Sequence, residues 1–136
     1  MRINSDIWVK AYLRRCQSGG ASAFVMRKGD DVRGAIYIKV SRLDGTAALY
    51  GPAPSAFGAD ISSAPGERQW IRNHKEEYKG DRDLDSELAR HVEFDSDIWI
   101  IEVEERTGRH YLDDWLAKSK DDGKNVIGAF RKAAGI

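Results

Sequence analysis

The sequence predicts an α+β domain, in which an antiparallel sheet of five or six strands is packed on one side by two helices. These are an N-terminal helix and a short helix near residues 83–92. The prediction rests on the helical apolar spacing of residues 5–18, the hairpin pattern of residues 34–54 and the strand alternation of residues 97–104. The 136 residues suit one domain. We place it at residues 1–116, before a basic tail over residues 117–136 with at most a short helix.

The N-terminal helix has signals at both ends. Asn4 and Ser5 offer side-chain oxygens to the first backbone N–H groups, and Asp6 favours the positive end of the helix dipole. Gly19-Gly20 ends the helix. Between these ends the apolar residues recur at helical spacing and predict one buried face: Trp8, Val9, Tyr12, Leu13 and Cys16.

A short strand over residues 23–27 and a polar loop lead into the hairpin, whose first strand alternates Ile36, Ile38 and Val40 with polar residues. Asp44-Gly45 suits a two-residue type I′ loop, because both of its residues need a positive φ. With that loop, Val40 lies opposite Leu49 in the core. Lys39 lies opposite Tyr50, with its stem along the aromatic ring.

After the hairpin, Pro52 and Pro54 stop the strand, because proline has no backbone N–H for the ladder. Residues 55–66 are small and turn-forming and predict a long loop. We expect a strand over residues 67–74. A helix capped by Asp83 should follow, with an apolar side made of Leu84, Leu88 and Val92.

The strand over residues 97–104 changes along one face from isoleucine to glutamate, which predicts that it emerges from the sheet into solvent. Thr107-Gly108 indicates a turn, from which residues 109–112 should return antiparallel. A helical turn is expected from Asp113 onward.

Three blocks of the sequence resemble the bacterial domain of unknown function 1491 family. They are Ile7-Trp8 with Leu13-Arg14-Arg15, the run from Arg42 to Pro54, and Asp97-Ile98-Trp99 with Glu102-Val103-Glu104. The likeness covers about residues 3–115 and leaves out the tail. It implies no activity, ligand or functional residue, because none is assigned to the family.

Composition limits the class of protein. No apolar run approaches the roughly 18 residues of a membrane-spanning helix, and one cysteine excludes an internal disulfide framework. We therefore expect a cytoplasmic protein without cofactors. The net charge is zero, but residues 1–50 carry +5, residues 51–116 carry −8 and residues 117–136 carry +3. The uneven charge indicates either an acidic face for a basic partner or two halves that complement each other.

Glu102, Glu104 and Asp113 are the candidate catalytic residues, since gathered carboxylates can hold a hard metal ion in a hydrolase or nuclease. The alternative is a solvated acidic strand end, which needs no metal. The histidines lie 17 and 19 residues apart, which fits no helical zinc motif. Cys16 lies on the apolar stripe of the helix, where an inert buried thiol is the common outcome.

Basic and aromatic residues on one predicted strand face resemble a stacking surface for single-stranded nucleic acid: Arg68, Trp70, Arg72 and His74. Nucleic-acid binding is nevertheless disfavoured, because the net charge is zero and no phosphate-binding motif is present.

The candidate binding surface is the hairpin exit, where an apolar patch can form. Its residues are Tyr50, Pro52, Pro54 and Phe57. The alternative is that Tyr50 and Phe57 cover an edge of the core. The sequence thus favours a small non-catalytic module that binds a protein partner or forms a homodimer, with the metal-dependent hydrolase and the nucleic-acid binder as alternatives.

Overall fold

The computed structural model describes residues 3–54 and 68–117. The expected loop over residues 55–66, Phe57 within it and the tail lie outside these residues. The elements, in chain order, are α1 (Ser5–Ser18), β1 (Ser22–Arg27), β2 (Ile36–Ser41), β3 (Thr46–Pro52), β4 (Trp70–Arg72), β5 (Lys79–Gly80), α2 (Asp81–Phe94), β6 (Trp99–Glu104) and the 3₁₀ turn η1 (Asp113–Trp115).

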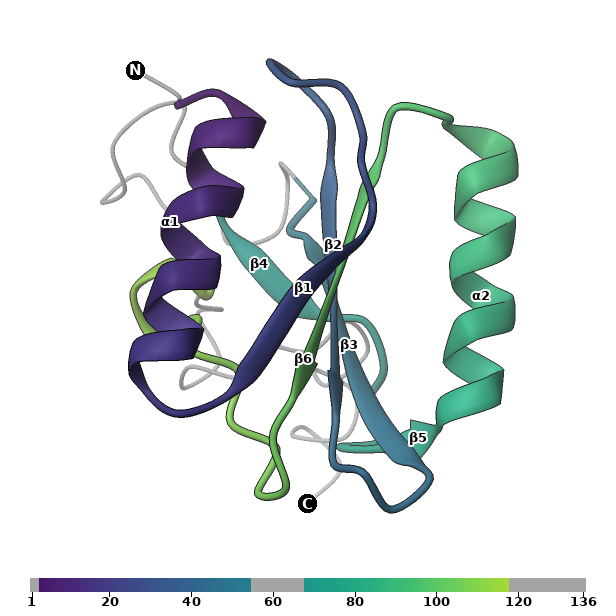
Figure 1. The fold of residues 1–136 in the computed structure, drawn as a ribbon. Coiled ribbons are helices and arrows are strands. Elements are labelled where there is room, and N and C mark those ends of the chain that lie inside the picture. Colours follow the sequence, from purple (N-terminus) through teal and green to yellow (C-terminus); the bar gives the residue numbers. More distant parts are fainter. Residues whose placement is uncertain (1–2, 55–67, 118–136) are drawn as a thin grey trace.

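The α+β class and the six-stranded sheet are confirmed. The strand order is β1-β6-β2-β3-β4, and β5 pairs with β3. All neighbours are antiparallel except β2 and β6, which run parallel. The expected purely antiparallel sheet is therefore corrected to a mixed one. The parallel pair arises because α2 carries the chain across a face of the sheet before β6 inserts between β1 and β2 (Figure 1).

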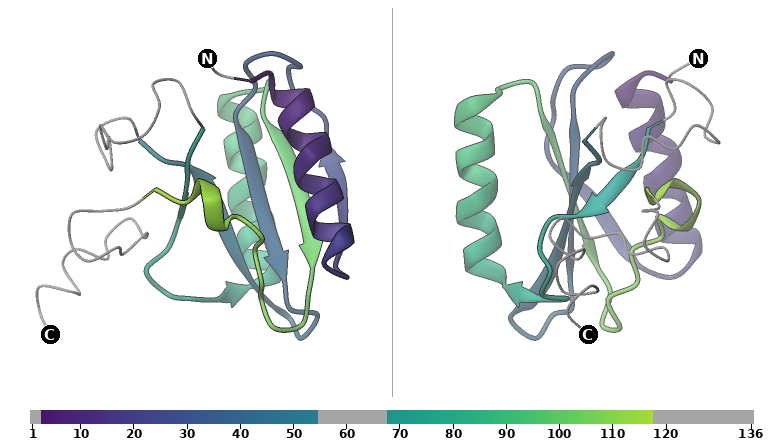
Figure 2. Two further views of the ribbon diagram at one scale, coloured as in Figure 1. Left: turned by 90° about the vertical axis from the view of Figure 1, so that its left-hand side faces the viewer. Right: turned by 180° about the vertical axis from the view of Figure 1, so that it is seen from behind.

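The two helices cover opposite faces of the sheet, so the expectation that both pack on one side is wrong (Figures 1 and 2). Strands β2 and β3 are mostly buried on both faces, as expected of strands covered twice. Ile38 and Val40 belong to the core under α1. Leu49 packs with Leu84 and Leu88 under α2.

The core under α1 is rich in aromatic rings. Trp8 stacks on Trp70 with 4.1 Å between ring centroids and on Tyr12 with 4.9 Å. Trp115 of η1 meets Trp8 edge-on at 5.0 Å. Trp70 is also anchored to the sheet, because its Nε1 donates to the Ile36 carbonyl at 2.9 Å. Stacked and edge-on pairs add to the free energy of burial, so this cluster fixes α1 and η1 on one face.

The hairpin is confirmed, but its register is shifted by one residue. Val40 pairs with Ala48 and Lys39 with Leu49, because the loop contains three residues, Leu43 to Gly45. Both ends of this loop have a positive φ, Leu43 at 65° and Gly45 at 88°. A shift of one residue exchanges the faces of a strand. Lys39 therefore points under α2 with Leu49 and does not lie along Tyr50.

Several element bounds also differ from expectation. The helix expected near residues 83–92 spans Asp81–Phe94 and begins after Gly80, so Asp83 is not its cap. The strand expected over residues 67–74 is reduced to three residues, Trp70–Arg72. α1, by contrast, occupies the predicted residues 5–18.

Residues 109–112 do not form the expected return strand, although the helical turn from Asp113 is confirmed. The segment is held by side-chain bonds to α1 instead of a ladder. Tyr12 Oη donates to the His110 carbonyl at 2.6 Å, and Tyr111 Oη donates to the Gly19 carbonyl at 3.1 Å. Tyr111 has a φ of 59°, which breaks the extended conformation of a strand.

Candidate interaction surface

Two of the three candidate catalytic carboxylates, Glu102 and Glu104, lie on the α2 side of the sheet, and Glu102 meets a buried lysine there. Lys39 of β2 is paired with Glu102 of β6, and its Nζ lies 3.8 Å from Glu102 Oε1. From the first turns of α2, Asp81 and Asp85 each place an oxygen 2.8 Å from the same Nζ. The lysine side chain is only 5% exposed, so one cation is shared by three carboxylates.

The directions in which the pKa values of Lys39 and Glu102 shift indicate the role of this cluster. Burial is the largest single influence and lowers the pKa of Lys39. Hydrogen bonds to Asp81 and Asp85, together with the charges of Glu102 and Asp85, outweigh it, and the pKa is raised. The pKa of Glu102 is raised as well, chiefly by burial. A lysine held protonated is neither a nucleophile nor a base. The cluster is an ion-pair network that ties α2 to the sheet.

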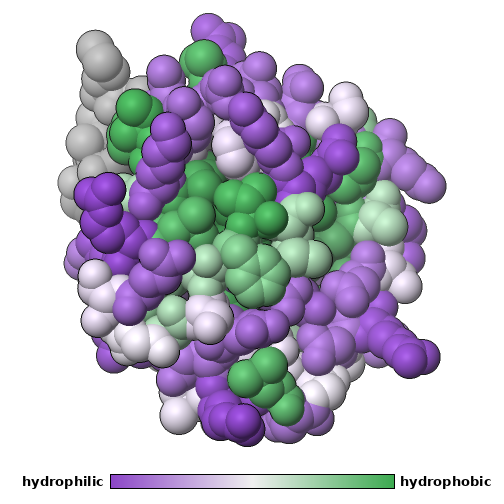
Figure 3. Space-filling view, viewed as in Figure 1, coloured by the Kyte–Doolittle hydropathy of each residue, from purple (hydrophilic) through white to green (hydrophobic). Residues whose placement is uncertain are grey.

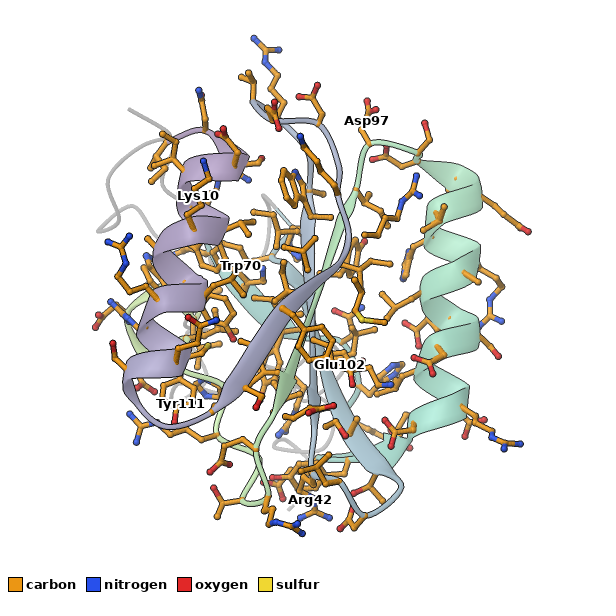
Figure 4. All side chains as sticks on the ribbon, viewed as in Figure 1. Lys10, Arg42, Trp70, Asp97, Glu102 and Tyr111 are labelled. Atoms are coloured by element: carbon orange, nitrogen blue, oxygen red, sulfur yellow. The ribbon has the colours of Figure 1, made fainter. Side chains whose placement is uncertain are left out.

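Asp113 does not join Glu102 and Glu104. It lies in η1, on the side of the sheet covered by α1, and its Oδ2 is 3.7 Å from the Arg109 guanidinium. Figure 4 shows Glu102 at the sheet, whereas Tyr111, two residues before Asp113, lies beside the end of α1. Within residues 3–54 and 68–117 no group of three or more metal-ligating side chains could hold a metal ion. The three predicted carboxylates are therefore not brought together.

The hairpin exit is divided between core and surface. Tyr50 is 7% exposed, and burial is the main cause that raises its pKa to about 12. Its ring packs 5.1 Å from that of His110. Pro52 and Pro54 are exposed. Of the four candidate binding residues, these two remain at the surface, while Tyr50 covers the core as the alternative expected and Phe57 lies outside the described residues.

The basic and aromatic strand face is also dispersed. Trp70 is a core residue at 2% exposure, and Arg68 is buried with its Nη2 2.8 Å from Ser5 Oγ. His74 instead lies by α2, with Nε2 2.7 Å from Glu87 Oε1. These positions leave no continuous stacking face. Cys16 is fully buried and burial raises the pKa of its thiol, as expected for an inert core cysteine.

An exposed apolar surface is found on β1, which the sequence analysis did not single out. Phe24, Val25 and Met26 are 38%, 39% and 56% exposed, and we call these three residues the β1 surface. This surface extends around the sheet edge, because Phe24 and Val25 point to opposite faces. β1 is an edge strand, and α2 packs against β3 and β5 at the other side of the sheet. The space-filling view shows the side of the molecule on which β1 lies, and apolar side chains gather in its middle with polar residues around them (Figure 3).

The C-terminal end of α2 borders the same surface. The Arg27 side chain at the end of β1 donates to the Ser96 carbonyl at 2.8 Å, which fixes the two ends together. Phe94, the last residue of α2, is 95% exposed. The apolar run Ala23 to Met26 is a sequence signal for a strand covered on both faces. Only the strand order shows that β1 is an edge strand, on which these apolar residues stay exposed.

The fold and surface together define a small α+β domain, with a mixed sheet between two helices and an uncovered apolar edge. The chain belongs to the family described as "Protein of unknown function (DUF1491)", which it matches over residues 3–113. The resemblance noted in the sequence is thereby confirmed. Among the described residues, no helix is long and apolar enough to cross a membrane.

Solved structures support the same membership. A crystal structure of a DUF1491 family protein from Caulobacter crescentus CB15 is 38% identical, with a TM-score of 0.67, over 85% of this chain and 98% of that one. An NMR structure of a DUF1491 family protein from the same organism is 36% identical, with a TM-score of 0.65, over 93% and 98%. A protein from A. tumefaciens is 35% identical, with a TM-score of 0.63, over 76% and 86%. No curated protein matches the sequence.

Proposed function

We propose that this protein is a non-catalytic interaction module of the cytoplasm, and that the β1 surface is its docking site for another protein. The observation that carries the proposal is the exposure of three consecutive apolar residues, Phe24 to Met26, on an edge strand. Contiguous apolar surface rimmed by polar residues is typical of protein–protein contact sites.

The charged clusters favour binding over catalysis. Lys39, the most buried cation of the α2 side, is neutralised by carboxylates and held protonated. Glu102 is engaged with that lysine, and Asp113 lies on the other side of the sheet. An enzyme needs a nucleophile, base or metal converging on one reacting atom. Among the described residues, no group of three or more His, Cys, Asp or Glu side chains could hold a metal ion.

Crosslinking from inside the proposed site tests this function. A photoreactive amino acid in place of Met26 should capture a discrete partner in cells, whereas the same amino acid in place of Arg82, exposed on α2, should not. The purified partner should then bind the wild type and bind the Phe24→Asp variant at least ten-fold more weakly. Equal capture at both positions, or equal binding by Phe24→Asp, contradicts the proposal.

A further inference from the structure

We infer that the β1 edge binds an extended segment of its partner as an additional strand, and that this segment alternates acidic with apolar side chains. The inference rests on the proposed function and names the partner's chemistry. It follows from three features of the same edge: its backbone, the charges along α1 and the charges along β6.

The backbone of β1 supplies the first feature. β1 pairs with β6 on one side, and no described strand pairs with its other side. In an antiparallel ladder, alternate residues direct their N–H and C=O groups away from the neighbouring strand. Such an edge can accept a further strand through main-chain hydrogen bonds. β1 spans Ser22–Arg27, and its register to β6 shifts between Val25 and Arg27, so a partner segment has the regular stretch Ser22 to Val25 to pair with.

A basic row lies on the face of α1 that reaches the start of β1 at its C-terminal end (Figure 1). Gln17 Nε2 donates to the Ala23 carbonyl at 3.1 Å, which places the C-terminal end of this face beside the start of β1 and takes up one backbone acceptor there. Lys10 and Arg14 precede Gln17 at seven and three residues and share its face. Both are exposed, and neither has an ion-pair partner among residues 3–54 and 68–117, whereas the neighbouring Arg15 is paired with Asp114. Figure 4 shows Lys10 on the outside of α1.

The opposite face of the edge carries negative charge. Phe24 pairs with Glu102 and Ser22 with Glu104, so these four side chains share the α2 side of the sheet. Ala23 and Val25 pair with Val103 and Ile101, which belong to the core under α1. A partner strand is therefore favoured when its acidic side chains face α1 and its apolar side chains lie beside Phe24. Successive residues of a strand point to opposite faces, and the required pattern is alternation.

A second copy of this chain fits the edge less well. Two β1 strands paired about a two-fold axis perpendicular to the sheet would bring α1 of both copies to the same side. Lys10 and Arg14 of one copy would then face the same cations of the other across the seam. Like charges at an interface select against that pairing. An acidic partner neutralises the row.

The test uses fluorescent peptides and the full chain. The first peptide contains five Val-Glu repeats, the second five Val-Lys repeats, and the third is the Val-Glu peptide with methylated backbone amides. We expect saturable anisotropy changes with the first peptide alone, with binding that weakens as salt is raised. The Lys10→Glu/Arg14→Glu variant should bind it at least ten-fold more weakly. Arg82→Glu/Arg90→Glu, an equal charge change on α2, should bind within two-fold of wild type.

Each result bears on the inference. Equal binding of the Val-Lys peptide would remove the acidic preference, and undiminished binding of the methylated peptide would remove strand addition. A dimer in sedimentation without peptide, abolished by Phe24→Asp, would show that a second copy occupies the edge. If the peptides fail while Met26 still captures a partner that requires Phe24, the proposed function stands and only the strand-addition inference is lost.

Discussion

Lys39 and Glu102 are direct partners in the parallel pair of β2 and β6, with Nζ 3.8 Å from Oε1 and side chains 5% and 16% exposed. Asp81 and Asp85, in the first turns of α2, also bind this lysine, and they belong to the helix that covers this face of the sheet. The pair therefore joins the only parallel ladder of the described sheet to the helix that covers it. Its energetics can be measured one residue at a time.

Lys39→Met should destabilise the fold by about 3 kcal/mol, the lower end of the range for removing one partner of a buried ion pair. Three carboxylates would lose their shared cation, although Asp85, at 62% side-chain exposure, still reaches water. Lys28→Met is the matched control, since the Lys28–Asp31 pair is exposed and such pairs contribute about 0–1 kcal/mol. Urea unfolding of both variants measures the difference. Equal losses would mean that the cluster is not a structural tie.

The Glu102→Gln variant should have a higher free energy of unfolding, relative to wild type, at pH 7 than at pH 4. The folded-state pKa of Glu102 is raised, chiefly by burial. Its contribution to stability is therefore fully present below the ordinary value of 4.5 and is lost as the pH rises through the raised pKa. Glutamine has no such cost at pH 7. Comparing the two proteins by urea unfolding at each pH cancels the titration of the groups they share.

The same comparison separates two interpretations of the acidic strand end. If Glu102 ionised freely to bind a metal, Glu102→Gln would show no gain between pH 4 and pH 7 and would lose a stabilisation by Mg²⁺ seen in wild type. A pH-dependent gain without any Mg²⁺ effect shows that burial, and no bound metal, governs the ionisation of Glu102.

The sequence predicted the elements better than their pairing, and the hairpin shows why. Alternation identified both strands, but the loop length decides which residues oppose each other. Leu43 takes a positive φ, which is rare for a leucine, and so the loop has three residues where Asp44-Gly45 suggested two. Leu49 consequently lies beside Lys39 on the α2 side, a pairing that alternation within one strand does not indicate.

His110→Asn should remove part of the acid sensitivity of the fold. The Leu112 N–H donates to His110 Nδ1 at 2.8 Å, which requires an unprotonated nitrogen, and burial lowers the pKa of His110. Its contribution is present above the ordinary value of 6.5 and is lost as the pH falls through the lowered pKa. Asparagine offers an acceptor oxygen that does not titrate there. The midpoint temperature of unfolding should fall less steeply from pH 7 to pH 5 for His110→Asn than for wild type. Parallel falls would contradict this role of His110.

The β1 surface could not be predicted from the sequence, for a related reason. Phe24 and its neighbours form an apolar run that suits a strand buried on both faces. Whether it is buried depends on strand order and on where α2 crosses the sheet. Both depend on contacts distant in sequence, such as the pairing of Ser22 with Glu104. The sequence indicated the apolar residues and could not indicate that they remain uncovered.

Phe94→Ser should leave the free energy of unfolding within about 0.5 kcal/mol of wild type, and Met26→Ser should cost less than about 1 kcal/mol. Their exposed fractions are 95% and 56%, so either substitution removes little buried apolar area. Leu88→Ala, at a residue 4% exposed under α2, should cost about 2–5 kcal/mol and serves as the control. Urea unfolding compares the three. A large loss at Met26 would show that this side chain serves the core, whereas an unchanged stability combined with weaker partner binding assigns the exposed apolar edge to recognition.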